Sequence, residues 1–319
     1  AWKANCQIAG PVANWLTELS SFVDLHNVQA AGALGMTCSA TIDNEKIELH
    51  DIAYHIDDLF LNGFGVKLNE PKTVGNGSLI YQIATGNITI ETATVSNKTV
   101  IAESKDIRIS FPGYLQIEGS VDFRGDVHRL ADWFELSPTS DSIFWYGGLN
   151  GTALFGSNEN GIGCRINSTI SDLSLHRQVE FAIKQAQPRP NGQILPAGHV
   201  TRQWQSVWQD SKVDLVGDIS LAPDFDALGF QNVKLESASL YATLDGAIRD
   251  LGNTMQADLT GTWKPGWDKI NQVFQSSFDG LCELSGNHLD QYAIQGPIFE
   301  QVNTTSGPTS QLSSNLQAT

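Results

Sequence analysis

The chain has 319 residues and a formal net charge of −16, from 19 basic and 35 acidic residues. A nucleic-acid binder needs clustered Lys and Arg to neutralise phosphates, so this composition argues against a nucleic-acid partner. The same charge argues against electrostatic docking on an anionic membrane surface, and any lipid contact is expected to be hydrophobic. No apolar run is long enough to span a bilayer, and no signal-peptide core is present.

The N-terminal part combines helix and strand patterns. Val12–Val23 has apolar residues at three- and four-residue spacing directly after Pro11, and it is predicted as a short helix. Apolar and polar residues then alternate with a period of two in Ile88–Thr92, Ile107–Phe111, Leu115–Glu118 and Val121–Arg124. Successive side chains of a strand point to opposite faces, so these segments are predicted as strands with one apolar face. Val127–Phe134 is predicted as a second short helix.

The C-terminal part repeats these patterns. Gln185–Gly198 is polar and contains prolines, and it is predicted as a long loop. Alternation returns in Val213–Leu215, Ile219–Leu221 and Leu240–Leu244, before a third predicted helix at Trp267–Phe278. Predicted turns lie at Asn76-Gly77, Gly86-Asn87, Ser96-Asn97-Lys98, Pro112-Gly113, Gly147-Gly148 and Asn160-Gly161. Short spacing between strands favours an all-β fold, with long antiparallel sheets dry on one face.

The three predicted helices belong to a repeated pattern. Each follows an alternating strand that ends at a glycine, namely Gly10, Gly125 or Gly261. A glycine lets the chain leave the strand, so that the aromatic-bearing helix can pack over an open end of the sheet. Spacing above 100 residues indicates duplicated modules and not a short-period solenoid. We predict modules at residues 1–136 and 137–301, and a disordered polar tail at 302–319.

Candidate catalytic and metal-binding residues are few. The densest ionisable cluster is His50–Asp58, whose imidazole and carboxylate groups could bind a divalent metal. Strand parity places His50 and His55 on opposite faces, so we predict a solvated strand and no metal site. Motifs for hydrolases, zinc proteases, phosphate loops and dinucleotide binding are absent from the sequence. The prediction is therefore a protein that is not an enzyme, with no catalytic residues and no cofactor.

Three further features allow more than one interpretation. Cys6, Cys38, Cys164 and Cys282 form no C-x-x-C pair, so we interpret them as small apolar residues, while three disulfide pairings stay open. Six N-x-[ST] sequons are either glycan acceptors of a surface protein or unmodified. They lie at Asn76, Asn87, Asn97, Asn150, Asn167 and Asn303. Trp204 and Trp208 would share the face of a helix, and we interpret them as packing residues.

These strand–glycine–helix units resemble those of the AsmA-like family of bacterial envelope proteins. The segments that carry the resemblance are Phe123–Leu130, Leu259–Trp263, Gly148–Ala153, Gly280–Gly286, Ile294–Ile298 and the paired strands Gly86–Ile90 and Ile107–Ser110. The resemblance implies a long curved β-sheet with a hydrophobic inner face, forming a groove. It also implies a periplasmic location, a role in outer-membrane maintenance and phospholipid transport between membranes.

The resemblance carries no catalytic residues, and this chain departs from the family by lacking its N-terminal membrane helix. We expect such an anchor outside this chain, upstream of Ala1. Phospholipid acyl chains are the expected partner, with envelope proteins as possible further partners. The alternative is a cell-surface or secreted β-sandwich, such as an adhesin or an assembly subunit. That alternative predicts closed cores, whereas the groove predicts an apolar face that stays open.

Overall fold

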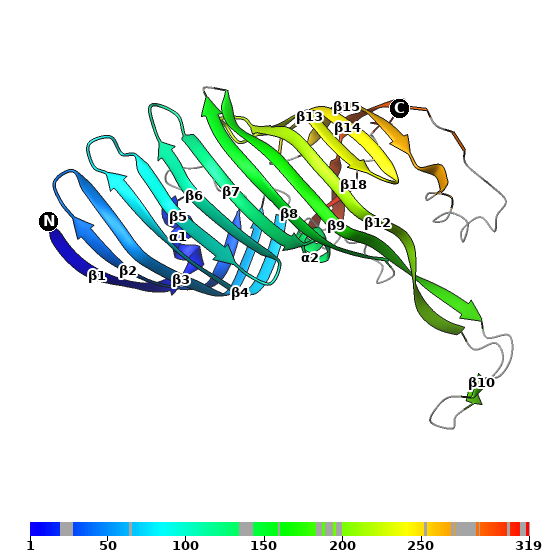
Figure 1. Ribbon diagram of the computed structural model, residues 1–319, viewed down its shortest axis with the longest axis horizontal. Coiled ribbons are helices and arrows are strands. Elements are labelled where there is room, and N and C mark those ends of the chain that lie inside the picture. The colour runs from blue at the N-terminus through cyan, green and yellow to red at the C-terminus, as the bar shows by residue number, and fades with distance from the viewer. Residues whose placement is uncertain are drawn as a thin grey trace.

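The sheet of this protein is one open layer. The computed structural model describes residues 1–19, 28–63, 66–133, 143–158, 160–182, 187–188, 194–195, 200–251, 254–268, 271, 285–286, 288–304, 307–312 and 317–318. These residues form a 15-stranded antiparallel sheet with two short helices, so the all-β prediction is confirmed (Figure 1). The sheet is long and curved, with β1 at one end, and the hairpin of β9 and β12 projects from it.

The strands lie in the sheet in chain order. They are β1 Trp2–Pro11, β2 Gln29–Ile42, β3 Lys46–Gly63, β4 Val66–Gln82, β5 Ile88–Ser96, β6 Val100–Ser110, β7 Gln116–Asp126, β8 Ile143–Asn158, β9 Gly161–Ala182, β12 Val200–Leu221, β13 Ala227–Ser237, β14 Leu240–Arg249, β15 Gln256–Pro265, β16 Asp290–Pro297 and β19 Gln317–Ala318. Two separate hairpins pair β10 Gln187–Pro188 with β11 Ile194–Leu195, and β17 Phe299–Thr304 with β18 Gly307–Leu312. The helices are α1 Val12–Leu19 and α2 Val127–Trp133.

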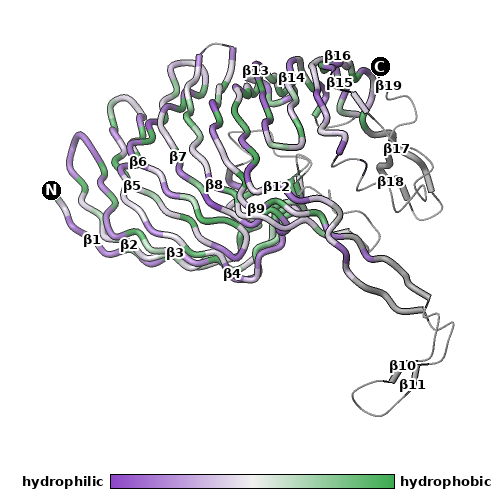
Figure 2. The backbone as a smooth tube through the Cα atoms, turned by 45° about the vertical axis from the view of Figure 1, so that its right-hand side comes forward, coloured by the Kyte–Doolittle hydropathy of each residue, from purple (hydrophilic) through white to green (hydrophobic). Residues whose placement is uncertain are grey.

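The two faces of the sheet differ in chemistry. Direct cross-strand partners lie on the same face, so the strand registers trace rows of side chains across the sheet. One row contains Ala4, Ala40, Leu49, Leu79, Ile90, Ile107, Gly119, Phe155, Cys164, Ile219, Phe230, Gly246, Leu259 and Ile294. We call its side the apolar face. The opposite side, the polar face, carries a row of Gln7, Thr37, Ala53, Asn76, Thr94, Glu103, Asp122, Thr152, Asn167, Val216, Lys234 and Thr243. Hydrophobic and hydrophilic residues accordingly alternate along the strands (Figure 2).

Bulges keep the apolar face continuous. Asp51, Asp58, Asp106, Asp172 and Asn232 have φ angles of 51–53° and lie at shifts of the strand register. Asp and Asn enter this left-handed region more readily than other non-glycine residues. A single added residue would turn all later side chains of a strand to the other face unless the register shifted with it. The register does shift, so apolar residues stay on one side before and after each bulge.

Glycines on the apolar face lie beneath aromatic rings of the next strand. Tyr54 is directly opposite Gly75, and a Cβ atom on Gly75 would overlap the tyrosine ring. Tyr292 and Gly261 repeat this arrangement, where the added Cβ would lie 2.8 Å from the tyrosine Cζ. A side chain at these positions would displace the ring, which explains glycine in the middle of a strand.

Two predicted turns were wrong for reasons visible in these strands. Asn76-Gly77 and Gly147-Gly148 lie inside β4 and β8 and form no turn. Gly77 has room for no side chain beside the Thr92 carbonyl, and Gly147 lies at a register shift. Leu115–Glu118 and Val121–Arg124 belong mainly to one strand, β7, which continues through Gly119. Val213–Leu215 and Ile219–Leu221 similarly both lie in β12.

Other predicted segments also changed. Trp204 and Trp208 lie in β12, not in a helix, and the Trp204 ring packs 4.5 Å from that of Phe144. Of residues 302–319, predicted as a disordered tail, the described ones lie in part of β17, in β18 and in β19. The predicted loop at 185–198 contains β10 and β11, and its remaining residues lie outside the described ranges, as does the module boundary at 136/137.

The sheet can be divided into two six-strand units with equivalent contacts. The first is β2 to β7 followed by α2, and the second is β8, β9 and β12 to β15 followed by helical residues 267–268. In the first unit the Asp126 N–H donates to the Thr99 carbonyl, and in the second the Gly266 N–H donates to the Ser239 carbonyl. The two donors, Asp126 and Gly266, are separated by the same number of residues as the two acceptors, Thr99 and Ser239. Gly266 is therefore equivalent to Asp126, and the predicted junction residue Gly261 instead lies inside β15.

Candidate functional site: the open apolar face

The apolar face is not covered by a second layer within the described part of the chain. In the row that defines it, only Ala40 and Leu259 are buried, and most of the others are half-buried. Seven hydrophobic residues are buried among those that the structure describes. They are Val28, Cys38, Ala40, Ala153, Val213, Ala257 and Leu259. A closed β-sandwich would bury the large aliphatic and aromatic residues of both inner faces, and this sheet leaves them accessible.

The total surface area agrees with this description. The chain exposes 20177 Å². A compact monomeric protein of its mass would expose about 13,000 Å². The excess is the expected consequence of a single-layer sheet, in which each strand is protected by its neighbours but not from above.

The two helices lie at the ends of strands, and Leu130 of α2 packs beside Gly125 of β7. Helix α1 packs against β2 and β1, and α2 packs against β8, β4 and β7. β5 ends where Ser96 pairs with Val74, whereas β4 continues toward Val66. Helix α2 therefore fills the notch between β4 and β8 that the shorter strands leave open. Within the described residues, neither helix is long and apolar enough to cross a membrane.

A buried carboxylate fixes this helix to the sheet. Glu70 of β4 is 2% exposed, and its Oε1 accepts hydrogen bonds from the Thr99 hydroxyl and from the Trp133 indole N–H at 3.2 Å. A recess of about 340 Å³ beside it is lined in part by Lys67 and Arg129. Glu70 thus joins β4, the turn between β5 and β6, and the end of α2. We assign it a structural role.

The second unit has a carboxylate at the equivalent position. Asp210 follows Glu70 by the same offset that separates Ser239 from Thr99, and it is 4% exposed. It accepts hydrogen bonds from the Ser239 and Ser237 hydroxyls at 2.9 and 3.0 Å and from the Trp208 indole at 2.9 Å. In both units, hydrogen bonds therefore join the equivalent turn to a buried acidic residue. Trp208, interpreted from the sequence as a packing residue, donates one of these bonds.

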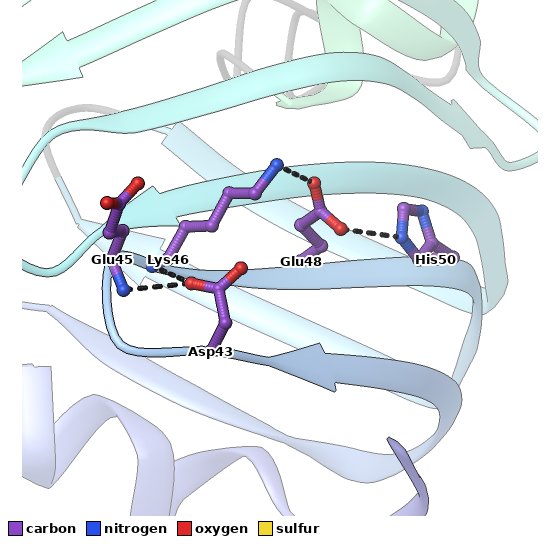
Figure 3. A network of polar contacts seen from close by, with 5 residues as sticks. All are labelled: Asp43, Glu45, Lys46, Glu48 and His50. Carbon is purple, nitrogen blue, oxygen red and sulfur yellow. Dashed lines mark hydrogen bonds and ion pairs between the residues drawn. The ribbon is translucent and has the colours of Figure 1, made fainter. Parts of the chain in front are cut away.

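Among the described residues, the polar face carries small groups of charged side chains that contact one another along a strand. In β3, Glu48 contacts both Lys46 and His50, the latter at 3.6 Å (Figure 3). The Lys46 ammonium group lowers the pKa of Glu48. In the preceding turn, Asp43 accepts backbone N–H bonds from Glu45 and Lys46 at 2.8 Å, and these bonds lower the pKa of Asp43. Both carboxylates are solvent-accessible. Glu48 contacts side chains along the strand, and Asp43 stabilises the turn.

His50 and His55 occupy positions that correct the parity prediction. His50 pairs with Ser39 and His55 pairs with Gly35, so the Asp51 bulge brings both histidines to the polar face. The partners are four residues apart, which separates the histidines by about 13 Å along the strand. They cannot share a metal ion at that distance. Among the described residues no group of three or more His, Cys, Asp or Glu side chains is arranged to hold a metal.

The sequons show a mixed environment. Asn76 and Asn167 lie in the polar-face row defined above. Asn97 is used internally, because its side-chain oxygen accepts hydrogen bonds from the N–H groups of Thr99 and Val100 at 2.8 and 2.7 Å. Ser237 accepts the equivalent bonds from Ser239 and Leu240 in the second unit. The Asn97 sequon is therefore explained by the turn.

Comparisons with protein-family models, with curated proteins and with solved structures find no match to this chain. The geometry of the apolar face is thus the basis for any functional assignment. The sequence predicted strands with one apolar side, but it did not reveal that these sides join in one uninterrupted row. That row depends on the bulges, two of which, at Asp51 and Asp58, lie in the ionisable cluster that was predicted to be a solvated strand.

Proposed function

We propose that this protein is a non-catalytic, AsmA-like envelope protein whose apolar face forms a groove for phospholipid acyl chains. In this role the chain would carry or transfer lipid between membranes and contribute to outer-membrane maintenance. The proposed location is the periplasm. The observation that carries the proposal is the row of apolar residues that crosses the sheet without a covering layer in the described residues.

The chemistry of this face suits acyl chains. A second row on the same face, about four residues along most strands from the first, contains Ile8, Met36, Tyr54, Gly75, Val95, Ala102, Phe123, Gly151, Ser168, Leu215, Leu235, Ala242 and Trp263, with no charged side chain. Each methylene moved from water onto such a surface contributes about 0.8 kcal/mol. A lipid headgroup would stay in solvent at the edge of the groove.

A closed β-sandwich adhesin or assembly subunit, the other function considered, has less support. It requires two sheets whose apolar sides meet, and the described strands form one main sheet that is not closed. An open sheet could still serve this alternative if a protein partner covered its apolar face. The experiment below distinguishes it from lipid.

Two neighbouring residues of β8 provide a matched test. Phe155 lies on the apolar face, whereas Leu154 lies on the polar face and is 50% exposed. The chain would be purified from a bacterial host, and its bound lipid would be extracted and quantified by mass spectrometry. We expect phospholipid in the wild-type protein, a several-fold decrease in Phe155→Glu and no change in Leu154→Glu. Far-UV circular dichroism would establish that both variants keep the sheet.

The same variants would be tested for uptake of a fluorescent phosphatidylethanolamine from vesicles. Uptake should follow the extracted lipid, so that Phe155→Glu binds less than Leu154→Glu. The proposal is wrong if the wild-type protein neither carries nor takes up phospholipid. Equal loss in both variants would likewise assign lipid binding to something other than the apolar face.

A further inference from the structure

Two cysteines face each other at the edge of the sheet. Cys6 of β1 pairs directly with Cys38 of β2, within a register that runs without a shift from Trp2 opposite Ile42 to Pro11 opposite Ala33. Both side chains are free thiols on the apolar face, where Cys38 is 7% exposed and Cys6 is half-buried. Directly opposed Cβ atoms in an antiparallel pair lie about 4.5–5.5 Å apart, close to the range that a disulfide spans.

The register also selects between the pairings that the sequence left open. Cys164 lies in β9, seven strands from β2. Seven strand spacings amount to about 34 Å, far beyond the reach of a disulfide. Cys282 lies outside the described residues. We propose that Cys6 and Cys38 are a redox-active pair that forms a cross-strand disulfide and ties the edge strand β1 to β2.

The chemistry needs a disulfide oxidant such as oxidised glutathione. The half-buried Cys6 thiolate attacks the oxidant, which forms a mixed disulfide and releases one glutathione thiolate. Cys38 then attacks the Cys6 sulfur and displaces the second glutathione. The two protein thiols are oxidised, the glutathione disulfide is reduced, and the two protons lost by the cysteines are taken up by the released glutathione thiolates.

The environment of Cys38 controls the second step. Burial and the neighbouring Cys6 thiol raise the pKa of Cys38, so less of it is thiolate near neutral pH. Ring closure should therefore accelerate as pH rises from 7 to 9. The first step, at the more accessible Cys6, precedes it. The product places an uncharged disulfide on the apolar face.

The protein provides a convenient cleavage pattern for the test. Cleavage after glutamate separates residues 1–18, which carry Cys6, from residues 19–45, which carry Cys38. The purified full chain would be equilibrated with excess oxidised over reduced glutathione, alkylated, digested and analysed by mass spectrometry. We expect the two peptides to be linked in most molecules and to separate after reduction. Cys164→Ser should keep the link, and Cys6→Ser should lose it.

Three outcomes would overturn the proposal. The two peptides could be recovered separately with both thiols alkylated. Cys6 could retain glutathione without closing onto Cys38, or it could link to another cysteine. None of these results depends on lipid binding, so the disulfide and the proposed lipid function fail independently. The peptide map is made on the wild-type chain, and its interpretation therefore does not require that the cysteine variants fold.

Discussion

The buried carboxylate at the notch predicts a difference between two threonine-to-valine substitutions. Thr99 is 3% exposed and donates its hydroxyl to Glu70, which is 2% exposed. Thr152 donates to Asp122 at 2.7 Å on the polar face, where Asp122 is exposed. Each substitution by valine removes one hydroxyl–carboxylate bond and keeps the β-branched shape. The two sites therefore differ mainly in burial.

Burial sets the expected magnitude. Removing one partner of a buried polar group costs about 1–3 kcal/mol, and an exposed polar substitution changes stability by about 0.5 kcal/mol or less. We expect Thr99→Val to lower the free energy of unfolding by about 2 kcal/mol. With an unfolding entropy of about 2.1 cal/mol/K per residue over the chain, this corresponds to a Tm about 3 °C lower. Thr152→Val should shift Tm by less than about 1 °C.

Thermal unfolding followed by circular dichroism would measure both shifts in one buffer. The backbone groups of Thr99 still bond to Asn97 and Asp126 after substitution, so the turn should persist. Equal shifts in the two variants would refute the reasoning, because they would mean that burial adds nothing to the Glu70 contact. Ser239→Ala, at the equivalent position of the second unit, should behave like Thr99→Val.

Three other measurements test local features. Lys46→Met should raise the NMR titration midpoint of Glu48 and leave that of Asp43 largely unchanged, because backbone N–H groups hold the Asp43 pKa low. Both lowered pKa values favour folding above about pH 4, and that contribution is lost as pH falls. Asp58 has a φ of 52°. In urea unfolding, Asp58→Val should cost about 1–2 kcal/mol, whereas Asp58→Gly should cost less, since only the valine is strained in the left-handed region. Gly75→Ala should cost about 1–3 kcal/mol by overpacking, because its Cβ would overlap the Thr94 carbonyl oxygen. A neutral result would contradict the tight approach at Gly75.

The sequence predicted most of the sheet because alternation is a local signal. Ile88–Thr92 and Leu240–Leu244 lie within β5 and β14, and the first two predicted helices begin with α1 and α2 at Val12 and Val127. Their last predicted residues, 20–23 and 134, lie outside the described ranges. The bulges could not be predicted, because the left-handed conformation of Asp51 depends on its neighbours in β2 and β4. That one residue reversed the predicted relation between His50 and His55.

The repeat was only partly predictable. Gly10 and Gly125 occupy strand ends, but the third glycine of the motif, Gly261, lies beneath the Tyr292 ring. The sequence alone does not distinguish a glycine that ends a strand from a glycine that makes room for an aromatic ring. The Glu70 and Asp210 contacts differ in residue type between the units, so sequence comparison could not align them. Their equivalence is a property of three-dimensional position.

The length of the apolar face depends on the number of six-strand units in the sheet. Six strands advance the sheet by about 29 Å, close to the thickness of a bilayer's hydrocarbon core. Each strand is stabilised chiefly by its immediate neighbours, so adding or removing a unit would change the reach of the molecule without requiring a new core. A sheet with one further unit would therefore present an apolar face longer by about 29 Å.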